Sequence, residues 1–215
     1  MIQQLSKENK LIYITGFWAG LIAFAATLSY VVVQLLQIAD KLSFPLDEFL
    51  IYGTSLCIVI PFVLEMLALH YIAPLEKKFW SHAAVIFSIM YAVFVTANYV
   101  VQLATVIPAK LKHTSGAIAV LDQTPHSLFW DFDALGYIFM GLAMFVALPV
   151  FEKRGFQKWV SISFLANALV TPLIAIVYFY PTYSEKLLFI GFAWGITAPL
   201  AMLQLAIFFK KELNR

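Results

Sequence analysis

The sequence predicts an all-α fold, a polytopic membrane helix bundle with six transmembrane helices and both termini cytoplasmic. The first observation is composition: 62% of the residues are hydrophobic, only 12% are charged, and the mean hydropathy is +0.87. A soluble domain carries roughly a quarter charged residues. The second is that apolar runs long enough to cross a hydrocarbon layer of about 30 Å recur along the whole chain. The third is the placement of lysine and arginine.

No polar stretch is long enough to form a separate globular domain, so residues 1–215 are expected to form a single integral membrane domain. The first apolar run is too long for the core of a signal peptide, and we expect it to be retained as a helix. The six expected spans cover residues 11–38, 49–73, 80–107, 128–150, 158–180 and 186–209.

The orientation follows from the basic residues. Ten lysine and arginine residues lie at the two termini and in the second and fourth connections, whereas four lie on the opposite side. The positive-inside rule therefore predicts that both termini are cytoplasmic, and an even number of spans also places them on one side.

Several classes of function are disfavoured. The net charge of +2 is small, and the basic residues stand singly or in pairs at the ends of apolar runs, so we expect the lipid bilayer and no nucleic acid as a partner. The four histidines lie on different segments without metal-binding spacing, and no lysine lies in the middle of a span. We therefore expect no metal and no cofactor. Cys57 is expected to be a small buried residue.

Small residues spaced four apart occur in the first and sixth spans, at Gly16 and Gly20 and at Gly191 and Gly195. Such spacing lets two helix backbones approach closely. Packing inside one bundle is the favoured interpretation, with a homo-oligomer or a larger membrane complex as the alternative. Asn167 in the fifth span is expected to form an interhelical hydrogen bond.

The segment 91–149 contains the most informative polar residues. Asn98 and Gln102 share one face of the third span, and Asp133 and Tyr137 share one face of the fourth, because residues four apart align on a helix. Asp131 points elsewhere. All belong to the predicted outer half of the membrane, so we expect a polar ligand-binding pocket that opens outward. The alternative for Asp131 and Asp133 is capping of a helix at the headgroup level.

Glu65 is the acid placed deepest in a predicted span, and His70 follows one turn later. A carboxyl group at that depth is either neutral or paired with another helix. The two residues form a candidate proton-coupled site, although a spacing of five places them on different faces. A neutral Glu65 hydrogen-bonded across the bundle is the alternative.

Several strings in the third to fifth spans are similar to those of a known group. Asn98-Tyr99-Val100-Val101-Gln102-Leu103, Pro125-His126-Ser127-Leu128-Phe129-Trp130, Gly136-Tyr137, Met140-Gly141-Leu142 and Pro149-Val150-Phe151 carry the likeness. They resemble a group of uncharacterised bacterial six-span integral membrane proteins with no established activity. The resemblance implies the six-span topology and the inner membrane of a bacterial cell, and it implies no particular activity.

The leading hypothesis is a membrane protein whose outward-opening pocket binds or conducts a small or lipid-like ligand, which includes transport. The ligand-binding candidates are Asn98, Gln102, Asp131, Asp133 and Tyr137. One alternative is an intramembrane enzyme acting on an isoprenoid or lipid, with Glu65 or Asp133 as the general acid. Another is an accessory subunit of a membrane complex, which would need no pocket.

Overall fold

The computed structural model describes residues 7–214, and in that range the chain is almost entirely helical and contains no strand. Six helical segments are long and apolar enough to span a membrane: Asn9–Ile38, Leu46–Ile72, Leu75–Leu111, Leu128–Val150, Gly155–Phe179 and Lys186–Leu213. The predicted all-α fold with six spans is therefore confirmed.

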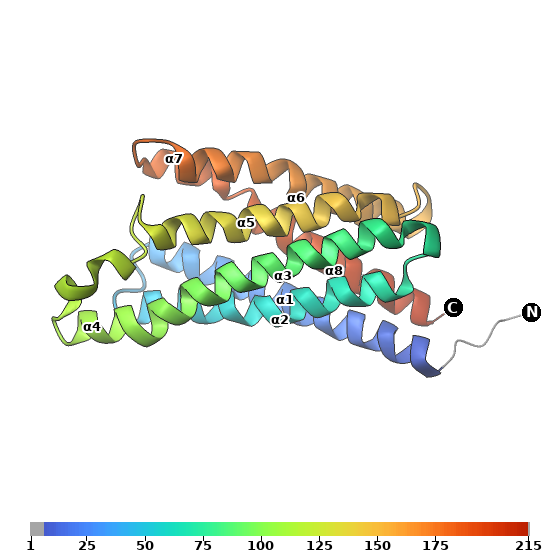
Figure 1. Cartoon of the computed structure of the whole chain (residues 1–215), viewed down its shortest axis with the longest axis horizontal. Helices are drawn as coiled ribbons and strands as arrows, with labels where there is room; N and C mark the ends of the chain where they lie inside the picture. The colour runs from blue at the N-terminus through green and yellow to red at the C-terminus, as the bar shows by residue number, and fades with distance from the viewer. Residues whose placement is uncertain (1–6, 215) are drawn as a thin grey trace, which may run out of the picture.

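Eight α-helices make up these spans and their extensions (Figure 1). They are α1 (Lys7–Ile38), α2 (Leu46–Ile72), α3 (Lys78–Val101), α4 (Ile107–Leu111), α5 (Leu128–Ala147), α6 (Gly155–Phe179), α7 (Glu185–Gly191) and α8 (Trp194–Leu213). The third span joins α3 and α4, and the sixth joins α7 and α8.

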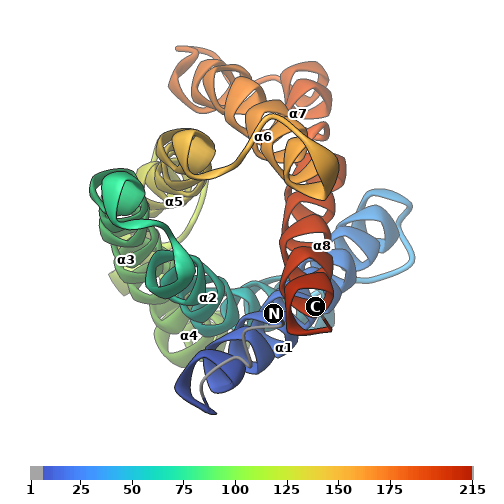
Figure 2. The same ribbon diagram turned by 90° about the vertical axis from the view of Figure 1, so that its right-hand side faces the viewer.

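The long helices form a closed ring in chain order. Each of α1, α2, α3, α5, α6 and α8 contacts the next, and α8 returns to α1 (Figure 2). The start of α1 and the end of α8 lie at one end of the bundle, which we call the terminal end; the opposite end is the far end. Every long helix therefore presents one face to a common interior.

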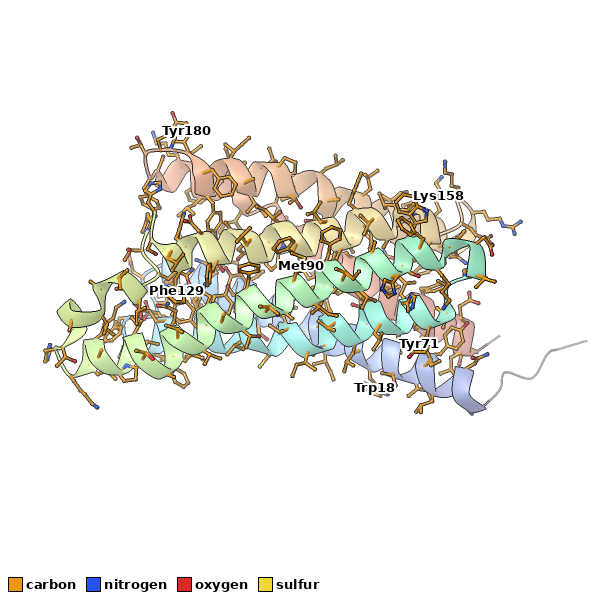
Figure 3. The ribbon with its side chains drawn as sticks, in the orientation of Figure 1. Trp18, Tyr71, Met90, Phe129, Lys158 and Tyr180 are labelled. Atoms are coloured by element: carbon orange, nitrogen blue, oxygen red, sulfur yellow. The ribbon has the colours of Figure 1, made fainter. Side chains whose placement is uncertain are left out.

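Large apolar side chains fill the middle of that interior. Phe62, Met66, Met140, Met144 and Met202 are all completely buried. The outer surface is also apolar: Trp18 is 55% exposed and Tyr71 62% exposed, and both lie toward the terminal end (Figure 3). An apolar exterior around a packed core is the arrangement expected of helices surrounded by lipid.

The glycines of α1 allow close packing inside the ring. A Cβ atom added at Gly16 would lie 2.7 Å from the ring of Phe209, and one at Gly20 would lie 2.9 Å from the Cβ of Ala206. Both partners belong to α8. The prediction that this motif packs within one bundle is confirmed, because its small residues face α8 inside the chain.

Two helices are interrupted near the far end. A π-helical turn over Gln102–Val106 precedes Pro108, whose missing N–H and bulky ring disturb regular α-helical bonding. The predicted sixth span is also discontinuous, because the chain makes a turn at Phe192 and Ala193 between α7 and α8. Gly191, next to this turn, is a weak helix former.

Two further expectations have clear outcomes. Asn167 joins helices as predicted: its Nδ2 donates to the Sδ of Met144 at 3.1 Å, and its Oδ1 accepts from Thr197 at 2.9 Å. The expected burial of Cys57 is wrong, because this residue is exposed. Its side chain is on the outer surface of α2, where lipid accommodates a small apolar group.

Candidate functional site

A buried carboxylate at the far end organises the polar interior of the bundle. Asp133, in the second turn of α5, is 5% exposed. Tyr99 of α3 donates its hydroxyl to Oδ1 at 2.5 Å, and Tyr178 of α6 donates its hydroxyl to Oδ2. Because α5 lies between α3 and α6 in the ring, Asp133 receives one tyrosine from each neighbouring helix.

An amide network beside this carboxylate involves the long connection before α5. The side chain of Gln123 lines the same cavity as Asp133, and its Oε1 accepts from Asn98 Nδ2 at 2.9 Å. Gln102 accepts from the backbone N–H of Gln123 at 3.2 Å and donates to the carbonyl of Leu121 at 2.8 Å. Asn98 and Gln102 are both fully buried, so they attach the connection to α3.

Next to Asp133 lies a cluster of aromatic side chains. The hydroxyls of Tyr30 and Tyr137 are 3.0 Å apart and hydrogen-bonded. The ring of Trp194 meets that of Tyr137 edge to face, with centroids 4.8 Å apart, and meets Tyr30 in the same way at 5.9 Å. Tyr178 stacks at a tilt against Trp130, with centroids 4.4 Å apart. Edge-to-face contacts are a favoured packing arrangement for aromatic rings.

These groups surround a cavity of about 290 Å³ at the far end of the bundle. Its rim includes Gln37 and Ile38 at the end of α1 and Glu48 at the start of α2. Its aromatic wall consists of Tyr30, Tyr52, Tyr99, Trp130, Tyr137, Tyr178, Phe192 and Trp194. A volume near 300 Å³ with mostly apolar walls and a few polar groups is typical of small-molecule sites.

A small ionic cluster stands at the rim. Lys110 lies 2.9 Å from Glu48 and 3.0 Å from Asp122, so one ammonium group serves two carboxylates. Glu48 keeps its second carboxylate oxygen, Oε2, without a hydrogen-bond partner. Asp47 accepts from Gln37 at 3.0 Å. The rim is therefore richer in acidic than in basic groups.

The predicted site residues divide into three groups. Asp133 and Tyr137 line the cavity, whereas Asn98 and Gln102 lie behind it and support the connection. Asp131 is exposed in the first turn of α5 and is not among the lining residues. Ser127 caps α5 by accepting from the backbone N–H of Trp130 at 3.2 Å, so neither aspartate provides that cap.

Glu65 and His70 belong to other parts of the bundle. Glu65 is 1% exposed beside Gly20 and Ala206, and within residues 7–214 its Oε1 has no hydrogen-bond partner. His70 bonds Ser81 through Nδ1 at 2.9 Å, toward α3 and the terminal end. The two side chains face different neighbouring helices, as their spacing of five predicts. Neither lines the cavity around Asp133.

Sequence reasoning missed several of the groups that complete the site. Tyr99, Tyr178, Gln123 and Trp194 contact or adjoin the Asp133 cluster, and none of them was among the predicted ligand-binding residues. One signal was present: Tyr30, Tyr99 and Tyr178 each lie toward the far end of an odd-numbered span. Their convergence depends on the closure of the ring.

Within residues 7–214, no group of three or more histidine, cysteine, aspartate or glutamate side chains is arranged to hold a metal ion. Comparison with protein families, curated proteins and solved structures gives no match for this chain. The function is therefore inferred from the geometry of the site alone.

Proposed function

We propose that this integral membrane protein binds a small, largely apolar ligand in the cavity around Asp133. The observation that carries the proposal is the combination of a ligand-sized cavity, an aromatic wall and one buried carboxylate at its polar end. Such sites gain affinity from apolar burial and orient the ligand through a few polar groups. Burying a carboxylate is costly, so its presence beside a cavity favours a functional role.

The packed centre of the bundle supports binding rather than free conduction. Phe62, Met66, Met140, Met144 and Met202 are fully buried between the cavity and the terminal end. Passage of a ligand across the membrane would require this layer to rearrange. The distribution of lysine and arginine supports a cytoplasmic terminal end, so the cavity would face outward. The sequence resemblance supports a bacterial inner membrane as the setting.

The test is native mass spectrometry of the protein purified in a mild detergent. Two glycines provide a matched pair of variants, because a Cβ atom at either Gly191 or Gly53 meets no atom within 4 Å. Gly191 lines the cavity, whereas Gly53 does not. We expect a molecule retained at one copy per chain by the wild type and by Gly53→Trp, and lost in Gly191→Trp.

Two results would contradict the proposal. One is equal retention of the molecule by both tryptophan variants, which would place it elsewhere on the protein. The other is no retained molecule combined with no change in melting temperature over a panel of small apolar compounds. That result would favour the accessory-subunit hypothesis.

A further inference from the structure

We propose that the ligand of this cavity is a free organic cation, an ammonium group that carries apolar substituents and a hydrogen-bond acceptor. The inference rests on the proposed function and specifies its ligand class. It follows from the charges of the lining residues, the aromatic wall and one unpartnered donor. These three observations are independent of one another.

The charged residues described in the cavity lining are all acidic. In the part of the chain that the structure describes, the lining includes Asp133 and Glu48 and contains no lysine, arginine or histidine. Among the described residues, the hydrogen bonds to Asp133 come from two neutral donors, the hydroxyls of Tyr99 and Tyr178. An ionised carboxylate in a membrane interior needs a compensating charge. A cationic ligand in the cavity supplies it.

Glu48 is only partly neutralised by its basic neighbour. Lys110 divides its ammonium group between Glu48 and Asp122, at 2.9 and 3.0 Å. The Oε2 atom of Glu48 has no hydrogen-bond partner in the part of the chain that the structure describes, and the side chain is 22% exposed. The rim therefore attracts a cation that approaches from the far end, and it repels an anion.

The aromatic wall matches a cation that has lost part of its hydration. Ring faces of tryptophan and tyrosine attract ammonium groups within about 6 Å of the ring centre, and several such rings around one site form a cage for alkylated ammonium groups. Trp194, Tyr137 and Tyr30 form an aromatic cluster through edge-to-face contacts, and all three line the cavity with Asp133. Tyr178 adjoins Tyr137, with ring centroids 5.9 Å apart, and it also contacts Trp130.

Trp194 also indicates an acceptor on the ligand. This residue is 6% exposed and lines the cavity, yet its indole Nε1–H has no hydrogen-bond partner among the described residues. A buried donor without an acceptor is costly, and a ligand oxygen near the ammonium group would satisfy it. The aliphatic residues of the cavity, Val31, Ile38, Ile51, Ile174, Val177 and Leu188, would contact the apolar part of the ligand.

A phospholipid headgroup is a poorer occupant than a free cation. Choline and ethanolamine headgroups carry a phosphate within a few bonds of their ammonium group. That phosphate would approach Glu48 and Asp133, and the lining that the structure describes contains no cationic residue to balance it. A free cation avoids this repulsion.

The test compares three compounds of similar shape on the wild-type protein in a non-ionic detergent. They are (2-phenoxyethyl)trimethylammonium, its neutral carbon isostere 3,3-dimethylbutyl phenyl ether, and the anion 3-phenoxypropionate. Binding is followed by tryptophan fluorescence, because Trp130 and Trp194 line the cavity. We expect the cation to bind at least about tenfold more tightly than the neutral isostere, and the anion to bind more weakly still.

Two aspartate variants then test whether the carboxylate of Asp133 is the group that binds the cation. Asp133→Asn is expected to weaken cation binding about tenfold and to leave binding of the neutral isostere within about twofold. Asp131→Asn is the matched control, because this exposed carboxylate is two residues away and does not line the cavity; its affinities should equal those of the wild type. The comparison of the cation with its neutral isostere uses the wild-type protein, so it does not depend on whether either aspartate variant folds.

Equal affinity for the cation and the neutral isostere would overturn the inference, and so would a phospholipid retained at one copy per chain and displaced by the cation. The experiment distinguishes failure of the cation assignment from failure of the proposed function. If the neutral compound binds and Gly191→Trp abolishes that binding, the cavity is a ligand site and only the cation assignment is lost. If none of the three compounds binds, and no retained molecule is found, the proposed function is lost as well.

Discussion

Two buried carboxyl groups of the same protein have opposite surroundings. Asp133 lies beside a cavity and receives hydrogen bonds from two tyrosines on neighbouring helices. Glu65 lies in the packed middle of the bundle against Gly20 and Ala206, and its Oε1 has no partner. Both are almost fully buried, at 5% and 1% exposed.

This difference shows that the depth of an acidic residue within a membrane span does not by itself identify a functional group. Asp133 is surrounded by donors from several helices and by a space that a ligand can enter. Glu65 is surrounded by close packing, where a neutral carboxyl group costs less than a charged one. The predictions that follow test this contrast, beginning with the largest expected effect.

Replacement of Asp133 by leucine should be the most damaging change. It leaves the hydroxyls of Tyr99 and Tyr178 without their buried acceptor, and each unsatisfied donor costs about 1–3 kcal/mol, so we expect a loss of about 3 kcal/mol in stability. Thermal unfolding in detergent measures the effect. Asp131→Leu, at an exposed position, should change stability by less than about 0.5 kcal/mol. Equal effects of the two replacements would remove the distinction between these aspartates.

Close packing around Glu65 predicts a clear effect of adding one methyl group. Gly20→Ala brings a Cβ atom against the Glu65 carboxyl and within 2.9 Å of the Ala206 Cβ, so we expect destabilisation by about 1–3 kcal/mol. Gly53→Ala is the control, because its Cβ meets nothing within 4 Å and alanine favours a helix. The two melting temperatures in detergent should move in opposite directions. A melting temperature for Gly20→Ala at or above that of the wild type would mean that this region is loosely packed.

The hydrogen bond between Tyr30 and Tyr137 should contribute modestly on the cavity side. Each single phenylalanine replacement is expected to cost about 1 kcal/mol, and the double replacement little more than either one, because both remove the same bond of 3.0 Å. A double-mutant cycle of melting temperatures measures the coupling. Strictly additive losses would show that the hydroxyls act through other partners.

The smallest effect is expected at the buried acid that lacks a partner. Glu65→Gln keeps the size of the side chain and should alter stability by less than about 1 kcal/mol, since no ion pair is lost. Ligand affinity in the cavity should stay within about twofold of the wild-type value. A large loss of binding or transport in this variant would instead support the proton-coupled role that the sequence suggested for Glu65.

Part of the site could be predicted from sequence because it depends on one helix at a time. The spacing of Asp133 and Tyr137 assigns them to one face of α5, and both line the cavity. The same reasoning separates Asp131 from them, and it is exposed. Asn98 and Gln102 share one face of the third span, and their hydrogen-bond partners lie in the connection before α5.

The sequence by itself determined the six spans and the polar faces within them, because hydropathy and helical periodicity are local properties of the chain. Only the tertiary structure decided that α8 closes on α1, that Tyr99 and Tyr178 both reach Asp133, and that Trp194 adjoins Tyr30 and Tyr137. These contacts depend on the rotation and order of neighbouring helices. Packing between helices sets both, and no single span encodes them.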